Sequence, residues 1–75
     1  MPLINVKCIE GVFTAQQKKR IATELTEALV RIEGENLRPA TVLIIEEVKS
    51  GDWAIGGRTL ATGDVRALAA GKSAA

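Results

Sequence analysis

The feature that most constrains the fold is a helical pattern enclosed between two apolar stretches. Thr14 and Gln17 have the spacing of a capping box, in which each side chain accepts the backbone N–H of the other residue. We therefore expect a helix to begin near residue 15. Gly34 supplies the signal for its end, and Pro39 prevents a continuation.

The predicted helix carries an apolar stripe at a spacing of three and four residues, which indicates that one side packs against other elements. The stripe consists of Ile21, Ala22, Leu25, Ala28, Leu29 and Ile32. The residues that face away are Lys19, Arg20, Thr23, Glu24 and Glu27. Glu27 and Arg31 have the spacing of a favourable ion pair. Val30 points away from the stripe, which makes it a subunit contact if the protein oligomerises.

Two strands are expected to flank this helix. Leu3–Ile9 alternates loosely between apolar and polar residues, as a strand buried on one side does, whereas Thr41–Ile45 is continuously apolar, as a strand covered on both faces is. A strand, a crossover helix and a second strand make a β-α-β unit with parallel strands and a right-handed crossover. Because the starts of parallel strands lie side by side, Pro2 should neighbour residues 38–42.

The C-terminal part reads as a hairpin followed by a tail. The paired glycines Gly56 and Gly57 suit a tight turn within residues 53–58. A short helix is expected over residues 64–70, with disorder beyond it. We divide the chain into a single domain, residues 1–60, and an Ala/Gly-rich tail, residues 61–75, that is partly disordered.

Composition narrows the classes of protein. A chain of 75 residues with one cysteine and no histidine has no internal disulfide and no usual zinc site, so oligomerisation is the expected source of stability. A net charge of +1 without a basic and aromatic cluster argues against nucleic-acid binding. No secretory signal and no apolar run near ~18 residues is present, so we expect a soluble cytoplasmic protein without membrane contacts. No metal and no cofactor are expected.

Met1-Pro2 is the candidate for chemistry. An aminopeptidase normally removes a methionine that precedes a small residue, and the proline nitrogen then changes from a tertiary amide into a secondary amine. The reference pKa of an α-amino group is roughly 7.7 to 8.0, and burial lowers it toward neutrality, where a general base works best. The alternative is a proline that merely initiates a strand.

Together these residues resemble the tautomerase superfamily, specifically the short-chain 4-oxalocrotonate tautomerase group. The matching features are Pro2, Glu10-Gly11, Thr14, Gln17-Lys18, the apolar strand ending in a glutamate, and Trp53 before Ile55-Gly56-Gly57. The resemblance runs from Pro2 to about Arg58. It implies an α/β protein with the β-α-β tautomerase fold (4-oxalocrotonate tautomerase/MIF-like) and a C-terminal β-hairpin. It also implies a four-stranded sheet formed by dimerisation, and a hexamer built as a trimer of dimers.

The resemblance also implies roles for residues. Pro2 matches the general base or acid for keto-enol tautomerisation of a small carboxylated enol, and Trp53 matches the aromatic residue of the pocket. Two arginines that hold the substrate carboxylate in the family do not carry over, because Val12 and Val42 occupy their positions. This absence matters because a bidentate arginine is the side chain that best fits a carboxylate.

Arg38 and Arg58 are the candidate substitutes for substrate binding, with solvated loop arginines as the plainer interpretation. Trp53 is equally consistent with a core or interface aromatic residue. Two further assignments stay open. The chain resembles the β-type subunit of trans-3-chloroacrylate dehalogenases, in which case it supplies Pro2 to a heterohexamer, either a tautomerase or a 3-haloacrylate dehalogenase, whose partner supplies arginines. The remaining alternative is a non-catalytic structural subunit.

Overall fold

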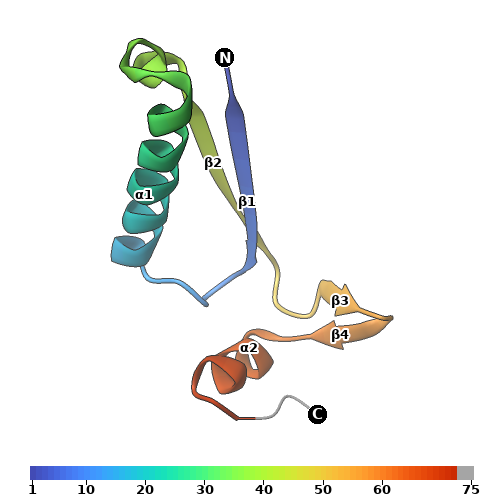
Figure 1. Ribbon diagram of the computed structural model, residues 1–75. Coiled ribbons are helices and arrows are strands. Elements are labelled where there is room, and N and C mark those ends of the chain that lie inside the picture. Colours follow the sequence, from blue (N-terminus) through green and yellow to red (C-terminus); the bar gives the residue numbers. More distant parts are fainter. Residues whose placement is uncertain (73–75) are drawn as a thin grey trace. The chain divides into compact units, whose positions relative to one another are not determined.

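The computed structural model describes residues 1–72, in which a β-α-β unit precedes a small hairpin and a second helix (Figure 1). The elements in chain order are β1 (Leu3–Ile9), α1 (Ala15–Glu33), the 3-10 helix η1 (Glu35–Ala40), β2 (Val42–Val48), β3 (Trp53–Ile55), β4 (Arg58–Leu60) and α2 (Thr62–Ala69). Strands β1 and β2 form one sheet, and β3 and β4 form another. The predicted β-α-β order and the C-terminal hairpin are confirmed.

The chain divides into two compact units. The first contains Met1–Val6 and Phe13–Glu46, and the second contains Lys7–Val12 and the chain from Glu47 onward. Strands β1 and β2 both begin in the first unit and end in the second. The predicted boundary at residue 60 remains a prediction. The disorder expected beyond residue 70 falls mostly on residues 73–75, outside the described part, whereas the Gly71 and Lys72 N–H groups donate to the Leu68 and Ala67 carbonyls.

Backbone hydrogen bonds fix the direction and register of β1 and β2. The Val42 N–H donates to the Pro2 carbonyl at 3.1 Å, and the Glu10 N–H donates to the Val48 carbonyl at 2.8 Å. Because starts pair with starts and ends with ends, the strands are parallel. In such a ladder Val42 lies opposite Leu3, so Pro2 lies beside Thr41, as expected for the two strand starts.

Helix α1 begins and ends where the sequence predicts. Thr14 Oγ1 accepts the Gln17 N–H at 3.1 Å, and Gln17 Oε1 accepts the Thr14 N–H at 2.8 Å, which completes the capping box. At the other end the Gly34 N–H donates to the Val30 carbonyl at 2.8 Å. Gly34 takes a φ of 102°, which only glycine adopts readily.

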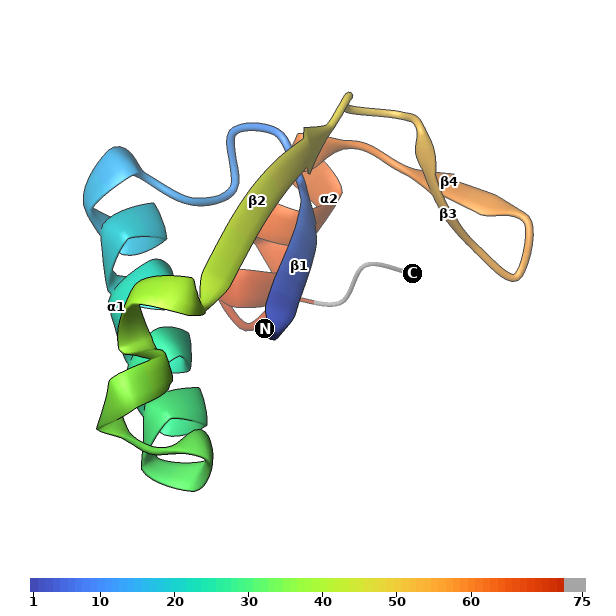
Figure 2. The same cartoon turned by 90° about the horizontal axis from the view of Figure 1, so that it is seen from above.

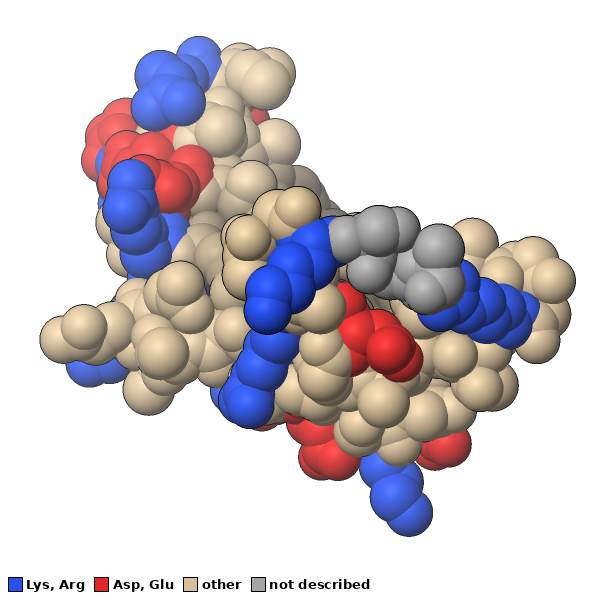
Figure 3. All heavy atoms as spheres, turned by 90° about the horizontal axis from the view of Figure 1, so that it is seen from below, with Lys and Arg blue, Asp and Glu red and all other residues tan. Residues whose placement is uncertain are grey.

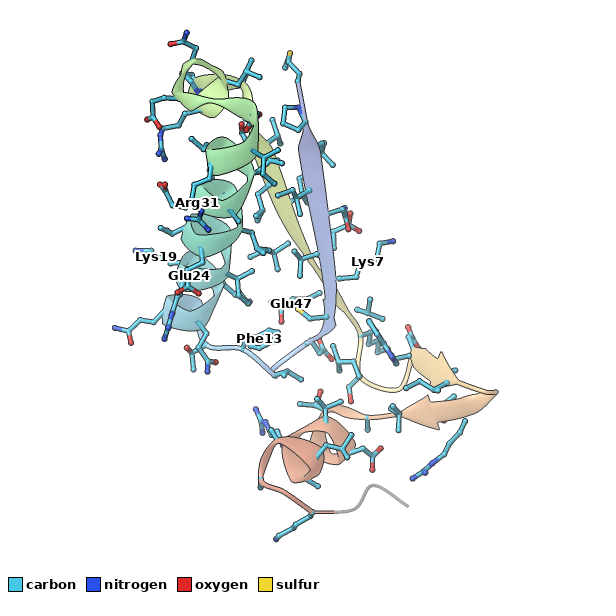
Figure 4. The ribbon with its side chains drawn as sticks, in the orientation of Figure 1. Lys7, Phe13, Lys19, Glu24, Arg31 and Glu47 are labelled. Carbon is cyan, nitrogen blue, oxygen red and sulfur yellow. The ribbon has the colours of Figure 1, made fainter. Side chains whose placement is uncertain are left out.

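The predicted inward face of α1 is partly wrong. Val30 is 5% exposed and Ile32 is 83% exposed, so the two residues have exchanged their expected environments. The half-buried residues of α1 include Ala22, Thr26, Leu29 and Glu33. The inward face is therefore rotated relative to the predicted stripe and includes Thr26 and Glu33, which were not predicted because they are polar. The predicted polar side is exposed at Lys19 and Glu24, which Figure 4 shows on the outer side of the helix.

Strand β2 also departs from its prediction, because one of its faces is open. Val42 is 40% exposed and Ile44 is 39% exposed, whereas Leu43 and Ile45 are half-buried on the side of α1. Figure 2 shows α1 lying along one side of the two strands. In β1 the expected alternation is confirmed for Leu3, which is 59% exposed on the open face.

The second unit consists of the strand ends, the hairpin and α2. Trp53 pairs with Leu60, and Ile55 pairs with Arg58, in an antiparallel register. Helix α2 confirms the predicted short helix and begins two residues early, where Asp64 Oδ2 accepts the Ala61 N–H at 2.8 Å. The Thr62 hydroxyl donates to the Glu10 carbonyl at 2.6 Å, so α2 is joined to the turn that follows β1.

Charges of both signs are interspersed on the face drawn in Figure 3. None of the helices within residues 1–72 combines the length and the apolar composition that a membrane-spanning helix requires.

Candidate active site

Pro2 lies half-buried at the first position before β1, and its carbonyl accepts the hydrogen bond that opens the β1-β2 ladder. Period-2 alternation puts Pro2 on the same side of the sheet as Ile4, which is the side that α1 lines. Met1 precedes it and is 93% exposed. The proline is therefore fixed by the sheet through its carbonyl, while the residue attached to its nitrogen projects into solvent.

Glu33 stands at the same end of the first unit. It is the last residue of α1, and its Oε2 lies 2.7 Å from the Thr41 hydroxyl. Its Oε1 is buried and has no hydrogen-bond partner among the described residues. Sequence reasoning missed this residue because it followed apolar positions only. The signal was present, since Glu33 stands three residues after the buried Val30 and four after Leu29.

Arg38, a predicted substrate-binding residue, is held by two carboxylates within its own unit. Its Nη1 and Nη2 donate to Glu27 Oε1 and Oε2 at 2.5 and 3.0 Å, and its Nε donates to Glu35 Oε1 at 2.6 Å. The hydrogen bonds from Arg38 hold the pKa of Glu27 and of Glu35 below the ordinary value, and those carboxylates raise the pKa of Arg38. Glu27, expected to pair with Arg31, instead binds Arg38.

These contacts limit how freely Arg38 could bind a substrate carboxylate beside the strand starts. Arg38 is brought to the end of the first unit that carries Pro2, because η1 leads directly into β2 (Figure 1). A substrate carboxylate would have to compete with Glu27 and Glu35 for its donors. Val42, where the resemblance led us to expect an arginine, presents an apolar side chain on the open face of β2.

Trp53 and Arg58 belong to the hairpin of the second unit. Residues directly opposite each other in an antiparallel pair share a face, so Trp53, Ile55, Arg58 and Leu60 all lie on one side of the hairpin. Leu60 is buried, Trp53 is half-buried, and Ile55 is 65% exposed toward the tip. The hairpin thus makes Trp53 and Arg58, two of the predicted site residues, diagonal neighbours. The other two, Pro2 and Arg38, belong to the first unit.

A third arginine was not singled out from the sequence. Arg66 of α2 donates from Nη2 to the Gly11 carbonyl at 2.7 Å, so it lies at the turn that carries Val12. The same turn is held by Glu47, whose Oε2 accepts the Gly11 N–H at 3.1 Å. No periodic pattern in the sequence indicates this contact, because it joins residues that lie far apart in the chain.

A hollow of about 350 Å³ lies at the start of α1, lined by Thr14, Gln16, Gln17 and Arg20. Because its lining residues belong to the N-cap and first turns of α1 and Glu33 is the last residue, this hollow is separated from Glu33 by roughly 20 to 28 Å of helix. It contains none of the predicted site residues. Within residues 1–72 no group of three or more Cys, Asp or Glu side chains is arranged to hold a metal ion.

Comparisons with known proteins agree on one family. The family model described as tautomerase enzyme matches residues 2–63. A probable tautomerase of Dickeya dadantii is 41% identical over 61 residues, which cover 80% of this chain and 88% of that protein. A probable tautomerase of Staphylococcus epidermidis is 40% identical over 57 residues, 76% of this chain and 90% of that protein. The crystal structure of a 4-oxalocrotonate tautomerase homologue superposes with a TM-score of 0.69 at 30% identity, covering 85% of this chain and 95% of that one.

Proposed function

The chain belongs to the tautomerase family, as an isomerase of the 4-oxalocrotonate tautomerase group, and we propose that Pro2, freed of Met1, is its general base and acid. The observation that carries this proposal is the position of Pro2. Its carbonyl is fixed by Val42, whereas Met1 is 93% exposed and so is accessible to an aminopeptidase. The same contacts are compatible with an enzyme and give no reason to prefer a silent structural subunit.

In the proposed reaction the prolyl amine takes a proton from the enol hydroxyl of a small carboxylated enol. The electron pair of the breaking O–H bond forms the carbonyl, and the protonated amine then returns the proton to carbon at the far end of the conjugated system. General acid-base catalysis of this kind contributes roughly 10²- to 10⁴-fold. The developing enolate also requires a cation or hydrogen-bond donors, for which Arg38 and Arg58 are the proposed sources and Trp53 the proposed apolar wall.

The proposed assembly is a hexamer in which the sheet is completed by dimerisation. Its support is the open face of the first unit, where Leu3 is 59%, Val42 40% and Ile44 39% exposed. Small domains of this size rarely gain enough stability from one core, and burial of apolar surface against a second copy supplies more.

A second candidate has its own support. Arg38 is occupied by Glu27 and Glu35, and valines stand at both family arginine positions, so a mixed hexamer in which a companion chain supplies the arginines is the alternative assembly. Co-expression of the chain with the product of a neighbouring short tautomerase-like gene, followed by native mass spectrometry, distinguishes the two assemblies. Mixed hexamers support the second candidate, and homohexamers alone exclude it.

The first test compares two forms of the same protein. Met-free protein should convert phenylenolpyruvate or 2-hydroxymuconate to its keto form, followed by the loss of enol absorbance. Protein that retains Met1, verified by intact mass, should be at least about a hundredfold slower because its proline nitrogen is an amide. Equal rates in the two forms would exclude the prolyl amine as the base.

A further inference from the structure

The most unusual polar group in the first unit is the carboxylate of Glu33. Its Oε1 is buried and lacks a partner among the described residues, and a buried polar group left unpaired destabilises the fold. Its Oε2 has to share its nearest hydrogen-bond donor with a backbone carbonyl. The Thr41 hydroxyl lies 2.7 Å from Oε2 and 2.8 Å from the Leu37 carbonyl, and one hydroxyl has a single proton to donate.

This carboxylate lies where Pro2 enters the sheet. Thr41 holds Glu33 and stands directly before Val42, whose N–H donates to the Pro2 carbonyl. The register puts Pro2 beside Thr41 on the neighbouring strand, at a strand spacing of about 4.8 Å. Both residues belong to the side of the sheet that α1 lines, so the end of α1 and the proline share one corner.

With Met1 attached, the Pro2 nitrogen has no hydrogen to donate. Removal of Met1 turns it into an amine that carries one hydrogen when neutral and two when protonated, which is the kind of donor that Glu33 lacks. We infer that Glu33 accepts a hydrogen bond from the freed Pro2 amine and so acts as a positioning residue for it. This inference rests on the proposed function, because it assigns Glu33 a part in the work of the proposed base.

Other charges near this corner do not duplicate that of Glu33. On α1 and η1, Glu27 and Glu35 are matched by the guanidinium of Arg38, and Arg31 is exposed. The starts of both strands, Leu3–Val6 and Val42–Ile45, contain no charged residue. Of the described carboxylates on α1 and η1 at this corner, that of Glu33 alone is not paired with a cation, so we expect it to have the largest effect on the charge state of the amine.

The sign of that effect opposes the effect of burial. Burial favours the neutral amine and lowers its pKa, whereas an adjacent carboxylate favours the ammonium form and raises it. Glu33 should thus keep the amine pKa higher than an apolar site alone would. It should also orient the nitrogen, because the hydrogen bond fixes the direction of the lone pair that takes the substrate proton.

The test uses Met-free, full-length protein and two matched variants. In Glu33→Gln the acid limb of the kcat/KM profile, and the Pro2 amine pKa measured by ¹⁵N NMR titration, should both move down by about one pH unit. Glu24→Gln removes an exposed carboxylate that pairs with Arg20 on the outer side of α1, and should move neither. Equal titrations of the two variants would overturn the inference.

Two readouts keep this result separate from the fate of the proposed function. The NMR titration reports on the amine whether or not an enol is converted, so a shift in Glu33→Gln without enzymatic activity would leave the inference standing and remove the proposed function. If Glu33→Gln does not fold, Glu33→Asp retains the charge but withdraws it by one methylene. It should shift the amine pKa in the same direction by less, and an unshifted pKa would count against the contact.

Discussion

The two ends of the β1-β2 sheet are built on opposite principles. At the strand ends, in the second unit, every backbone group of Gly11 has a partner: Glu47 accepts its N–H at 3.1 Å and Arg66 donates to its carbonyl at 2.7 Å. At the strand starts, in the first unit, Glu33 Oε1 has no partner among the described residues, and the nitrogen of Pro2 is an amide. The candidate site therefore coincides with a carboxylate oxygen that lacks a partner among the described residues, and not with the groups that are bonded most fully.

The largest effect is expected at Pro2. Pro2→Ala, with Met1 removed, should lower kcat/KM for an enol substrate by roughly 10²- to 10⁴-fold. Its melting temperature should change little, because the hydrogen bond from Val42 goes to the backbone carbonyl, which alanine retains. Steady-state kinetics and thermal unfolding at one protein concentration measure both. A variant of undiminished activity would reduce Pro2 to a strand-initiating residue.

Gly11→Ala should have the converse effect. Gly11 has a φ of 77°, and an added Cβ would stand 3.3 Å from Thr62 Cγ2, so we expect a loss of about 1 to 2 kcal/mol in the free energy of unfolding. Activity per folded molecule should be retained. Gly63→Ala is the matched control, because no heavy atom lies within 4 Å of its added Cβ and its φ is not positive.

Chemical denaturation at fixed protein concentration measures this difference, since the stability of an oligomer depends on concentration. Equal stabilities of the Gly11 and Gly63 variants would show that the turn is more compliant than its hydrogen bonds indicate. A loss of kcat/KM in Gly11→Ala beyond the loss of folded protein would show that the strand ends take part in function.

The smallest effect is expected at Arg38, and it depends on pH. Glu27 and Glu35 have lowered pKa values in the folded state, so their stabilisation is fully present above the unfolded value of about 4.3 and disappears as the pH falls through the lowered values. The melting temperature of Arg38→Met should therefore lie below that of the native chain at pH 7 and approach it near pH 3. A difference in melting temperature that stays constant between pH 7 and pH 3 would exclude the ion pairs as the cause of that difference.

The same variant also tests whether Arg38 binds the carboxylate of the substrate. If Arg38 serves only Glu27 and Glu35, KM for the enol remains unchanged in Arg38→Met. A several-fold increase in KM at neutral pH would instead show that Arg38 leaves its carboxylates to bind substrate. Arg58→Met, on the hairpin of the second unit, is the comparison that separates the two proposed sources of positive charge.

Local signals predicted most of the fold. Thr14, Gln17 and Gly34 set the ends of α1 because capping is a matter of a few adjacent backbone groups, and the paired glycines predicted the hairpin for the same reason. The alternation in β1 predicted its open face. The 3-10 helix η1 was not predicted, since Pro39 rules out a longer α-helix but does not prevent a short 3-10 turn.

Features that depend on distant parts of the chain were missed. The inward rotation of α1, which buries Val30 and exposes Ile32, follows from how the helix packs and not from its own composition. Arg38 was predicted at the correct end of the first unit, but its capture by Glu27 required tertiary geometry. Glu33 was overlooked because only apolar residues were assigned to the inward face of the helix, and its burial beside Thr41 becomes evident only in the folded structure.

The pairing of Pro2 with Val42 also orders events during synthesis. The hydrogen bond that opens the sheet cannot form until Val42 has been added, and at translation rates of about 5 to 20 residues per second the chain between them takes roughly 2 to 8 seconds to make. In the proposed function, where Met1 is the initiator, Met1-Pro2 is unpaired throughout that interval. An aminopeptidase acting on the nascent chain would therefore create the amine before the sheet closes beside it.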